Sequence, residues 1–409
     1  MIGSLQEQCK KNADGVHIIC LQDTSEYNYQ HHYNRLRNGS LGIVGNDIDH
    51  GFFAHVMLCF DARSTLPVGI SFCKLWGRDP ERLDKYERKY KSLPIEEKES
   101  FRWLEAAKQT KELLHTAEQL TFISDRESDI YQLWSRIPDI KSNLIIRGRS
   151  DRSLYDKPST VFKTIKEQAV VGSYTIELKE DKRKNRTRRT AKLNVKYTNV
   201  LIKKSYEPKS RKTNDPDYIS LYVIESKEDE STIKTGEAAV HWILYTTHQI
   251  NNYEQAKEII QWYSFRWQIE QFFRITKKQG LDAESSQLET GEALMKLILM
   301  SFAVAMKILQ LCLARDGTYN DMVEKYFDSE ELIVLKVLNN NLQGNTIKQQ
   351  NPFPEKTLSW AAWIIARLGG YSGYKSQSPP GPITYKWGLD KFNQLVEGFY
   401  LAKKDVYKE

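Results

Sequence analysis

The stretch YSFRWQIEQFFRITKKQG, Tyr263–Gly280, is predicted to be a helix that holds a single acid, Glu270, among cations and aromatic rings. At about 100° per residue, four polar side chains share a stripe roughly 60° wide. These are Tyr263, Arg266, Glu270 and Lys277. Apolar residues such as Ile269 and Phe272 fall on a second stripe, which we expect to face the core.

Glu270 has two interpretations. It could form an i,i+4 ion pair with Arg266 on a solvated surface. Alternatively, it could bind a metal ion with two other acids that end predicted strands, Asp23 after VHIICLQ and Asp125 after QLTFIS. Strand ends of this kind meet at one edge of a sheet. Three carboxylates placed together repel one another unless a divalent cation neutralises them.

Hard oxygen ligands suit Mg²⁺ or Mn²⁺, and the surrounding cations suit a phosphodiester substrate. The pattern therefore predicts phosphoryl transfer with two metal ions. One ion lowers the pKa of the nucleophile and the other stabilises the leaving oxygen.

Composition sets the broad class. The chain has 409 residues, 40% of them hydrophobic, and a net charge of +7. This is typical of a globular protein and permits a polyanionic partner without establishing one. The five cysteines have no metal-binding spacing and lie partly in apolar runs, which predicts buried thiols in a reducing compartment. The apolar run Leu297–Leu313 contains Lys307 and predicts a buried helix, with no membrane partner.

The first 150 residues alternate strand and helix patterns, which predicts a mixed sheet flanked by helices. Two runs of β-forming residues, Gly51–Phe60 and Leu66–Trp76, predict a hairpin. The other predicted elements are the strands Val16–Asp23, Gln119–Asp125 and Ser142–Arg149, and the helices Pro94–His115 and Arg126–Ile137.

Residues 151–247 predict an antiparallel β insert, because several runs alternate polar and apolar side chains. The segment DKRKNRTRRT, Asp181–Thr190, has six cations in ten residues. Such a segment is usually a solvated loop, but at a hairpin tip it could also contact a phosphate backbone. The candidate DNA-contacting residues here are Arg183, Arg186 and Arg188.

The rest of the chain predicts helices. One long helix runs from about Asn251 to Lys278, with Gly280 as its C-cap. Further helices are expected at 290–315, 320–340 and 355–368. After the Gly- and Pro-rich connector Gly369–Pro382, a last helix carries one apolar stripe: Leu389, Phe392, Val396 and Phe399. This stripe either packs on the protein's own core or forms an interaction surface.

Three segments resemble the DDE transposases of the insertion-sequence-four type. YSFRWQIEQFFRITK fits the family's Y-x2-R-x3-E-x6-K signature with Tyr263, Arg266, Glu270 and Lys277. LQDTSEYNY is similar to the segment of the first catalytic aspartate, which would be Asp23, and ISDRESDIY to the segment of the second, Asp125. The resemblance extends over nearly the whole chain.

The resemblance implies an RNase H-like core in two parts, 1–150 and 248–315, with the β insert at 151–247. The terminal helix after the connector predicts that 316–409 is a C-terminal helical dimerisation region. The resemblance further implies a bacterial DNA transposase that is cytoplasmic and associated with the nucleoid. Such an enzyme binds two Mg²⁺ or Mn²⁺ ions through Asp23, Asp125 and Glu270. It nicks transposon ends in double-stranded DNA, forms a hairpin and transfers the strand within a synaptic homodimer.

The resemblance also implies individual roles. Trp242 would stack on a flipped base, although it could instead serve strand packing. Tyr263, Arg266 and Lys277 would hold phosphates near that base. Arg147 would contact a phosphate, although it could instead be a surface cation.

The family usually carries a helical end-binding domain before its first aspartate. Only 22 residues precede Asp23, so that domain is predicted to be missing. Two alternatives follow. The chain could be a truncated, non-catalytic DNA-binding or inhibitory derivative, or an RNase H-like nuclease without strand transfer.

Overall fold

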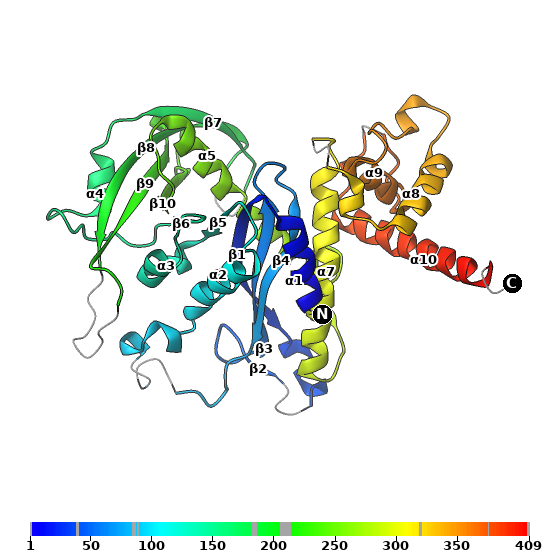
Figure 1. The fold of residues 1–409 in the computed structure, drawn as a ribbon, viewed down its shortest axis with the longest axis horizontal. Helices are drawn as coiled ribbons and strands as arrows, with labels where there is room; N and C mark the ends of the chain where they lie inside the picture. Colours follow the sequence, from blue (N-terminus) through cyan, green and yellow to red (C-terminus); the bar gives the residue numbers. More distant parts are fainter. Residues whose placement is uncertain are drawn as a thin grey trace.

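A mixed β-sheet forms the centre of the protein in a computed structural model (Figure 1). The structure describes residues 2–37, 41–83, 87, 90–181, 186–204, 214–318, 321–374 and 376–406. The described strands are β1 (His17–Asn28), β2 (Gly42–Ile43), β3 (His50–Asp61), β4 (Pro67–Trp76), β5 (Gln119–Ser124), β6 (Ser142–Arg147), β7 (Gly172–Leu178), β8 (Arg189–Lys203), β9 (Tyr218–Glu228) and β10 (His241–Thr246). The described α-helices are α1 (Ile2–Ala13), α2 (Phe101–Leu113), α3 (Tyr131–Arg136), α4 (Val161–Lys166), α5 (Tyr253–Ser264), α6 (Trp267–Lys277), α7 (Gly291–Ala314), α8 (Ser329–Leu342), α9 (Leu358–Leu368) and α10 (Pro382–Val406).

The strand order confirms the predicted α/β architecture. Strands β4, β3 and β1 are antiparallel neighbours, while β5 and β6 follow β1 in parallel. This arrangement, flanked by helices, is consistent with an RNase H-like fold. The predicted hairpin is β3–β4.

The antiparallel insert adds to this sheet. Strand β10 pairs antiparallel with β6, and β9, β8 and β7 follow in turn. The four-part division of the chain at 150, 247 and 315 remains a prediction.

Strict alternation along the strands assigns each residue to one of two faces of the sheet. On β1, Ile19 and Leu21 pack in a core with α5, α6 and α7. Their neighbours Ile18 and Cys20 pack in a second core with α1, α2 and α3. We call these the α6 face and the α2 face.

Helix α7 joins the α6 face to the C-terminal helices (Figure 1). Among the described helices it is the one long and apolar enough to cross a membrane, but it packs against β4, α6, α9 and α10. On α10, Leu389, Phe392 and Val396 are buried. The apolar stripe therefore packs on the protein's own core.

Some element boundaries were wrong in the sequence analysis. The strand at Asp23 does not end there, because β1 continues to Asn28 paired with β3. The long helix breaks into α5 and α6 at Phe265 and Arg266, where successive bonds close three-residue turns, such as Arg266 N–H to Tyr263 O. Helix α2 begins only at Phe101, and 126–137 forms a 3₁₀ turn followed by the short α3.

Candidate active site

Asp23 and Asp125 lie at one edge of the sheet. The parallel β1–β5 ladder ends at the pair Leu21–Ile123, and each aspartate lies two residues beyond that pair. Because Leu21 and Ile123 both point to the α6 face, alternation points both carboxylates to that face too. The edge predicted from sequence is correct, although Asp23 lies within its strand.

Helix α6 brings Glu270 to the aspartates. Ile269 and Phe272 of this helix are fully buried on the α6 face. Glu270, which lies between them in the sequence, has a partly exposed side chain. Arg266 forms an ion pair with Glu270 and also approaches Asp23, at 3.6 Å between Nη1 and Oδ2. The i,i+4 ion pair considered from sequence is therefore present. It lies within the group of Asp23, Asp125 and Glu270, which we call the carboxylate cluster.

The charges of the cluster act on Asp23. Burial, together with the nearby carboxylates of Asp125 and Glu270, raises the pKa of Asp23 to about 7. The Thr24 N–H, which donates to Oδ1 at 2.7 Å, and the Arg266 guanidinium oppose this rise. Arg266 thus neutralises the repulsion between the carboxylates only in part.

The three carboxylates have the donor chemistry that a hard divalent cation requires. The unrelieved repulsion at Asp23 also favours an added positive charge. However, within the described ranges no group of three or more His, Cys, Asp or Glu side chains is arranged to hold a metal ion. The guanidinium of Arg266 contacts both Asp23 and Glu270.

Aromatic and basic side chains adjoin the carboxylates. The rings of Trp242, on β10, and Tyr263, on α5, meet edge to face at 5.4 Å between centroids. Arg147 ends β6, pairs in register with Leu244 and donates to the His241 carbonyl at 3.3 Å. Burial lowers the pKa of Arg147, and the Tyr263 hydroxyl lies nearby.

Two polar atoms in this group are buried without a hydrogen-bond partner among the described residues: Tyr263 Oη and Arg147 Nε. Burial raises the pKa of Tyr263, while the guanidiniums of Arg266 and Arg147 oppose that rise. Buried polar atoms normally have hydrogen-bond partners. Two such atoms without a partner beside the carboxylate cluster therefore indicate a place where a ligand could bind. The donor chemistry of both atoms suits a phosphate.

The other predicted contact residues are Lys277, Arg183, Arg186 and Arg188. Lys277 donates to the Glu26 carbonyl, lies 3.7 Å from the Glu284 carboxylate and stacks over Tyr27. Arg186 and the exposed Arg188 precede β8. Because strands β10, β9 and β8 alternate in direction from β6, these two arginines lie at the same sheet edge as Arg147. Arg183 lies outside the described residues.

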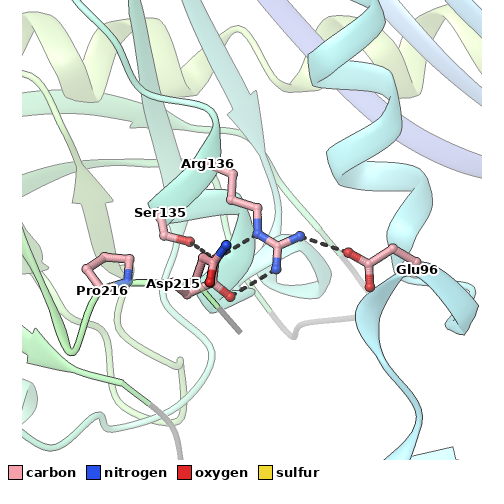
Figure 2. A pocket seen from close by; sticks show the side chains of 6 residues that line it. Glu96, Ser135, Arg136, Asp215 and Pro216 are labelled. Atoms are coloured by element: carbon pink, nitrogen blue, oxygen red, sulfur yellow. Dashed lines mark hydrogen bonds and ion pairs between the residues drawn. The ribbon is translucent and has the colours of Figure 1, made fainter. Parts of the chain in front are cut away.

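A surface pocket of about 440 Å³ is separate from this site. Figure 2 shows Arg136 held between Glu96 and Asp215 in that pocket, at 2.8 Å and 2.7 Å respectively. None of the pocket's lining residues belongs to the carboxylate cluster. We interpret it as a structural ion-pair cluster.

Carboxylates that hold two metal ions are typical of enzymes such as nucleases, polymerases and phosphatases. Residues 104–307 match the family model described as a transposase DDE domain. The match supports a transposase as the general class of this protein. It covers Asp125 and Glu270 but begins after Asp23, so Asp23 depends on the sheet register and on its proximity to Arg266.

Two further residues of this region were not assigned from sequence. Asp129 completes the D-R-E-x-D segment, but its carboxylate binds Arg152 and is 1% exposed, which indicates a structural role. Arg102 of α2 reaches the segments of both aspartates. Nothing in the helical pattern of 94–115 distinguishes Arg102 from the other cations there.

Changing Tyr263 to Phe tests whether its orphaned hydroxyl serves a ligand. We expect the free energy of unfolding to stay unchanged or to rise by up to about 1 kcal/mol, because an unsatisfied buried group is removed. DNA affinity should fall roughly tenfold or more, the value of one hydrogen bond to a charged group. Chemical denaturation and filter binding would measure the two effects.

Tyr155→Phe is a suitable control, since Tyr155 is half exposed and stacks on Tyr218. A hydroxyl that only supported the fold would lower stability in the variant and leave binding unchanged.

Proposed function

We propose that this protein is a cut-and-paste DNA transposase that cleaves transposon ends through Asp23, Asp125 and Glu270. The observation that carries the proposal is the convergence of these acids from two strands and a helix, with Arg266 between them. The match to a transposase DDE domain supports the reaction class.

The three carboxylates would hold the divalent ions, with Arg266 moving away from Glu270. Two Mg²⁺ or Mn²⁺ ions would supply nucleophile activation and stabilisation of the leaving oxygen. The free guanidinium of Arg266, together with Tyr263 Oη and Arg147, would then bind phosphate oxygens of the cut strand. Lys277 would contribute a phosphate contact only after leaving Glu284.

The test is cleavage of the DNA in which the coding sequence lies, with several hundred base pairs of its native flanks. We expect Mg²⁺-dependent nicks at the element's ends, followed by hairpins and joined products on gels. A protein with Glu270→Ala should give none of these.

The same assay separates the alternatives left by the sequence. A truncated inhibitory derivative would retard the DNA without cutting it, even in Mn²⁺. A nuclease without strand transfer would cut and never join. Either result would contradict the proposal.

Trp242→Ala should impair hairpin formation more than the first nick. Base–aromatic stacking is worth about 1–3 kcal/mol per base, and a flipped base is needed only when the strand folds back. Time courses on denaturing gels, started from intact and from pre-nicked DNA, would resolve the two steps. Tyr155→Ala is the control, since Tyr155 is a half-exposed aromatic residue that stacks on Tyr218, outside the site. Equal losses in both steps would instead indicate that Trp242 supports the sheet.

We also propose that the protein acts as a homodimer on DNA in the cytoplasm. Large apolar side chains on α10 remain exposed, among them Trp387 at 56% and Leu401 at 59%. A face of this kind supports a protein–protein contact. Light scattering with and without DNA would test this assembly.

A further inference from the structure

Arg102, near the start of α2, links the two strand segments that carry the aspartates. Its Nε donates to Thr24 Oγ1 at 2.9 Å, and its Nη2 donates to Glu127 Oε2 at 2.9 Å. Its Nη1 donates to the Glu99 carbonyl at 2.9 Å, which fixes the third side of the guanidinium. The side chain is 13% exposed.

Two of these three partners, Thr24 and Glu127, are hydrogen-bonded to an aspartate through their main chain. Thr24 N–H donates to Asp23 Oδ1 at 2.7 Å, and Glu127 N–H donates to Asp125 Oδ1 at 2.9 Å. Thr24 points to the α2 face while Asp23 points to the α6 face. One guanidinium therefore binds the side chains of the two residues whose main-chain N–H groups bind the carboxylates of Asp23 and Asp125.

The hydroxyl of Thr24 is held from a second side. A guanidinium can only donate, so Thr24 Oγ1 accepts from Arg102, and it donates to His55 Nδ1, 2.8 Å away, when Nδ1 carries no proton. Burial, together with the charges of Arg102 and Lys74, lowers the pKa of His55 well below its usual value. The neutral ring then donates from Nε2 to Gln22 Oε1 at 3.3 Å. These contacts fix the rotamer of Thr24.

The sheet itself does not tie these two segments together. Strands β1 and β5 are paired only as far as Leu21–Ile123, so no main-chain ladder joins Asp23 to Asp125. From these contacts we infer that Arg102 is a positioning residue that sets the separation and orientation of Asp23 and Asp125 for metal binding. This inference rests on the proposed function.

Arg102 also packs against aromatic rings, at 5.3 Å from the Trp103 centroid and 5.9 Å from that of Trp76. A purely structural role would follow from that packing alone. The test therefore needs readouts that a loss of packing would not change.

We would compare Arg102→Gln, Arg102→Ala and Arg102→Lys with the wild-type full-length chain. The first readout is Mn²⁺ affinity, from calorimetry without DNA. The second is the cleavage rate at saturating DNA and metal. Loss of a side chain that orients metal ligands typically costs about 10–100-fold in affinity or activity. We expect a decrease of that size for Gln and Ala, and partial recovery of Arg102→Ala in millimolar guanidinium.

Arg136→Gln is the matched control. Arg136 also bridges two acids, Glu96 and Asp215, but neither contacts an aspartate of the site. We expect it to lower the melting temperature while metal affinity and cleavage stay within twofold of wild type.

Thr24→Val tests the same contact from the other partner, since it removes one hydroxyl with little change in shape. It should weaken Mn²⁺ binding even if Arg102→Gln does not fold.

The outcomes are distinguishable. Wild-type protein that binds Mn²⁺ without cutting DNA would overturn the proposed function, and the affinity comparison would still decide the role of Arg102. Arg102→Gln and Thr24→Val that bind Mn²⁺ as Arg136→Gln does, with no effect of guanidinium, would overturn the positioning role. Wild-type protein that neither binds nor cuts would overturn both.

Discussion

Asp125→Asn is expected to reduce DNA cleavage by about a thousandfold or more while the fold is retained, and Asp23→Asn and Glu270→Gln should do the same. Each change keeps the shape of the side chain and removes the charge that would hold a divalent ion. The corresponding alanine variants should be equally inactive. Initial rates on end-containing DNA would measure the loss.

Stability provides the second readout for these variants. Burial and two neighbouring carboxylates disfavour the charged form of Asp23, so Asp23→Asn should melt no lower than wild type without metal. The Asn oxygen can still accept from Thr24 N–H. Glu254→Gln is the control, because that acid lies on α5 with its side chain 75% exposed. Near-wild-type cleavage in any one variant would remove that residue from the site.

Asp129→Ala should give the largest loss of stability among these variants. The Asp129 carboxylate binds Arg152 Nε at 2.9 Å and accepts from Arg149 N–H at 3.0 Å. The carboxylate is 1% exposed and the Arg152 side chain is 14% exposed. Removal of the carboxylate therefore leaves the guanidinium and the main-chain donor poorly solvated and without this acceptor. Breaking a buried pair in this way costs about 3–5 kcal/mol. Urea unfolding followed by circular dichroism would measure this loss.

The control for Asp129 is a more exposed ion pair. Glu105 contacts Lys74 at 2.6 Å, with side chains 23% and 43% exposed, so Glu105→Ala should cost less than about 1 kcal/mol. Asp129→Asn should fall between the two, because it keeps an acceptor but not the charge. If Asp129→Ala is no less stable than Glu105→Ala, then Arg152 is not held by this carboxylate.

Sheet periodicity made much of the site predictable. An apolar run followed by an acid placed Asp125 directly after β5, and the same pattern placed Asp23 at the matching level of β1. Helical spacing placed Arg266 four residues before Glu270, and the two side chains are in contact. These predictions depend on local periods of two and 3.6 residues, which a sequence displays directly.

Other features depend on contacts between distant segments. Strand β1 extends past Asp23 because β3 pairs with it as far as Asn28–Gly51. The residues near Asp23 do not indicate which strand will pair with them. Phe265 and Arg266, where the helix breaks, keep helical backbone angles, so the helical period of the sequence could not reveal the break. Arg102 acquires its partners only when α2 packs on the sheet, since Thr24 lies 78 residues away from it.

The α6 face is built from segments that lie far apart in the sequence, and this affects folding during synthesis. Tyr27 Oη and Thr276 Oγ1 form a buried hydrogen bond of 2.7 Å across 249 residues. While a ribosome is still synthesising the insert, one side of the sheet therefore has no cover, and its apolar side chains face water. Such intermediates aggregate readily, and the long-range pairing slows folding. Nascent chains stalled near residue 250 should need a chaperone, and those extended past α7 should not.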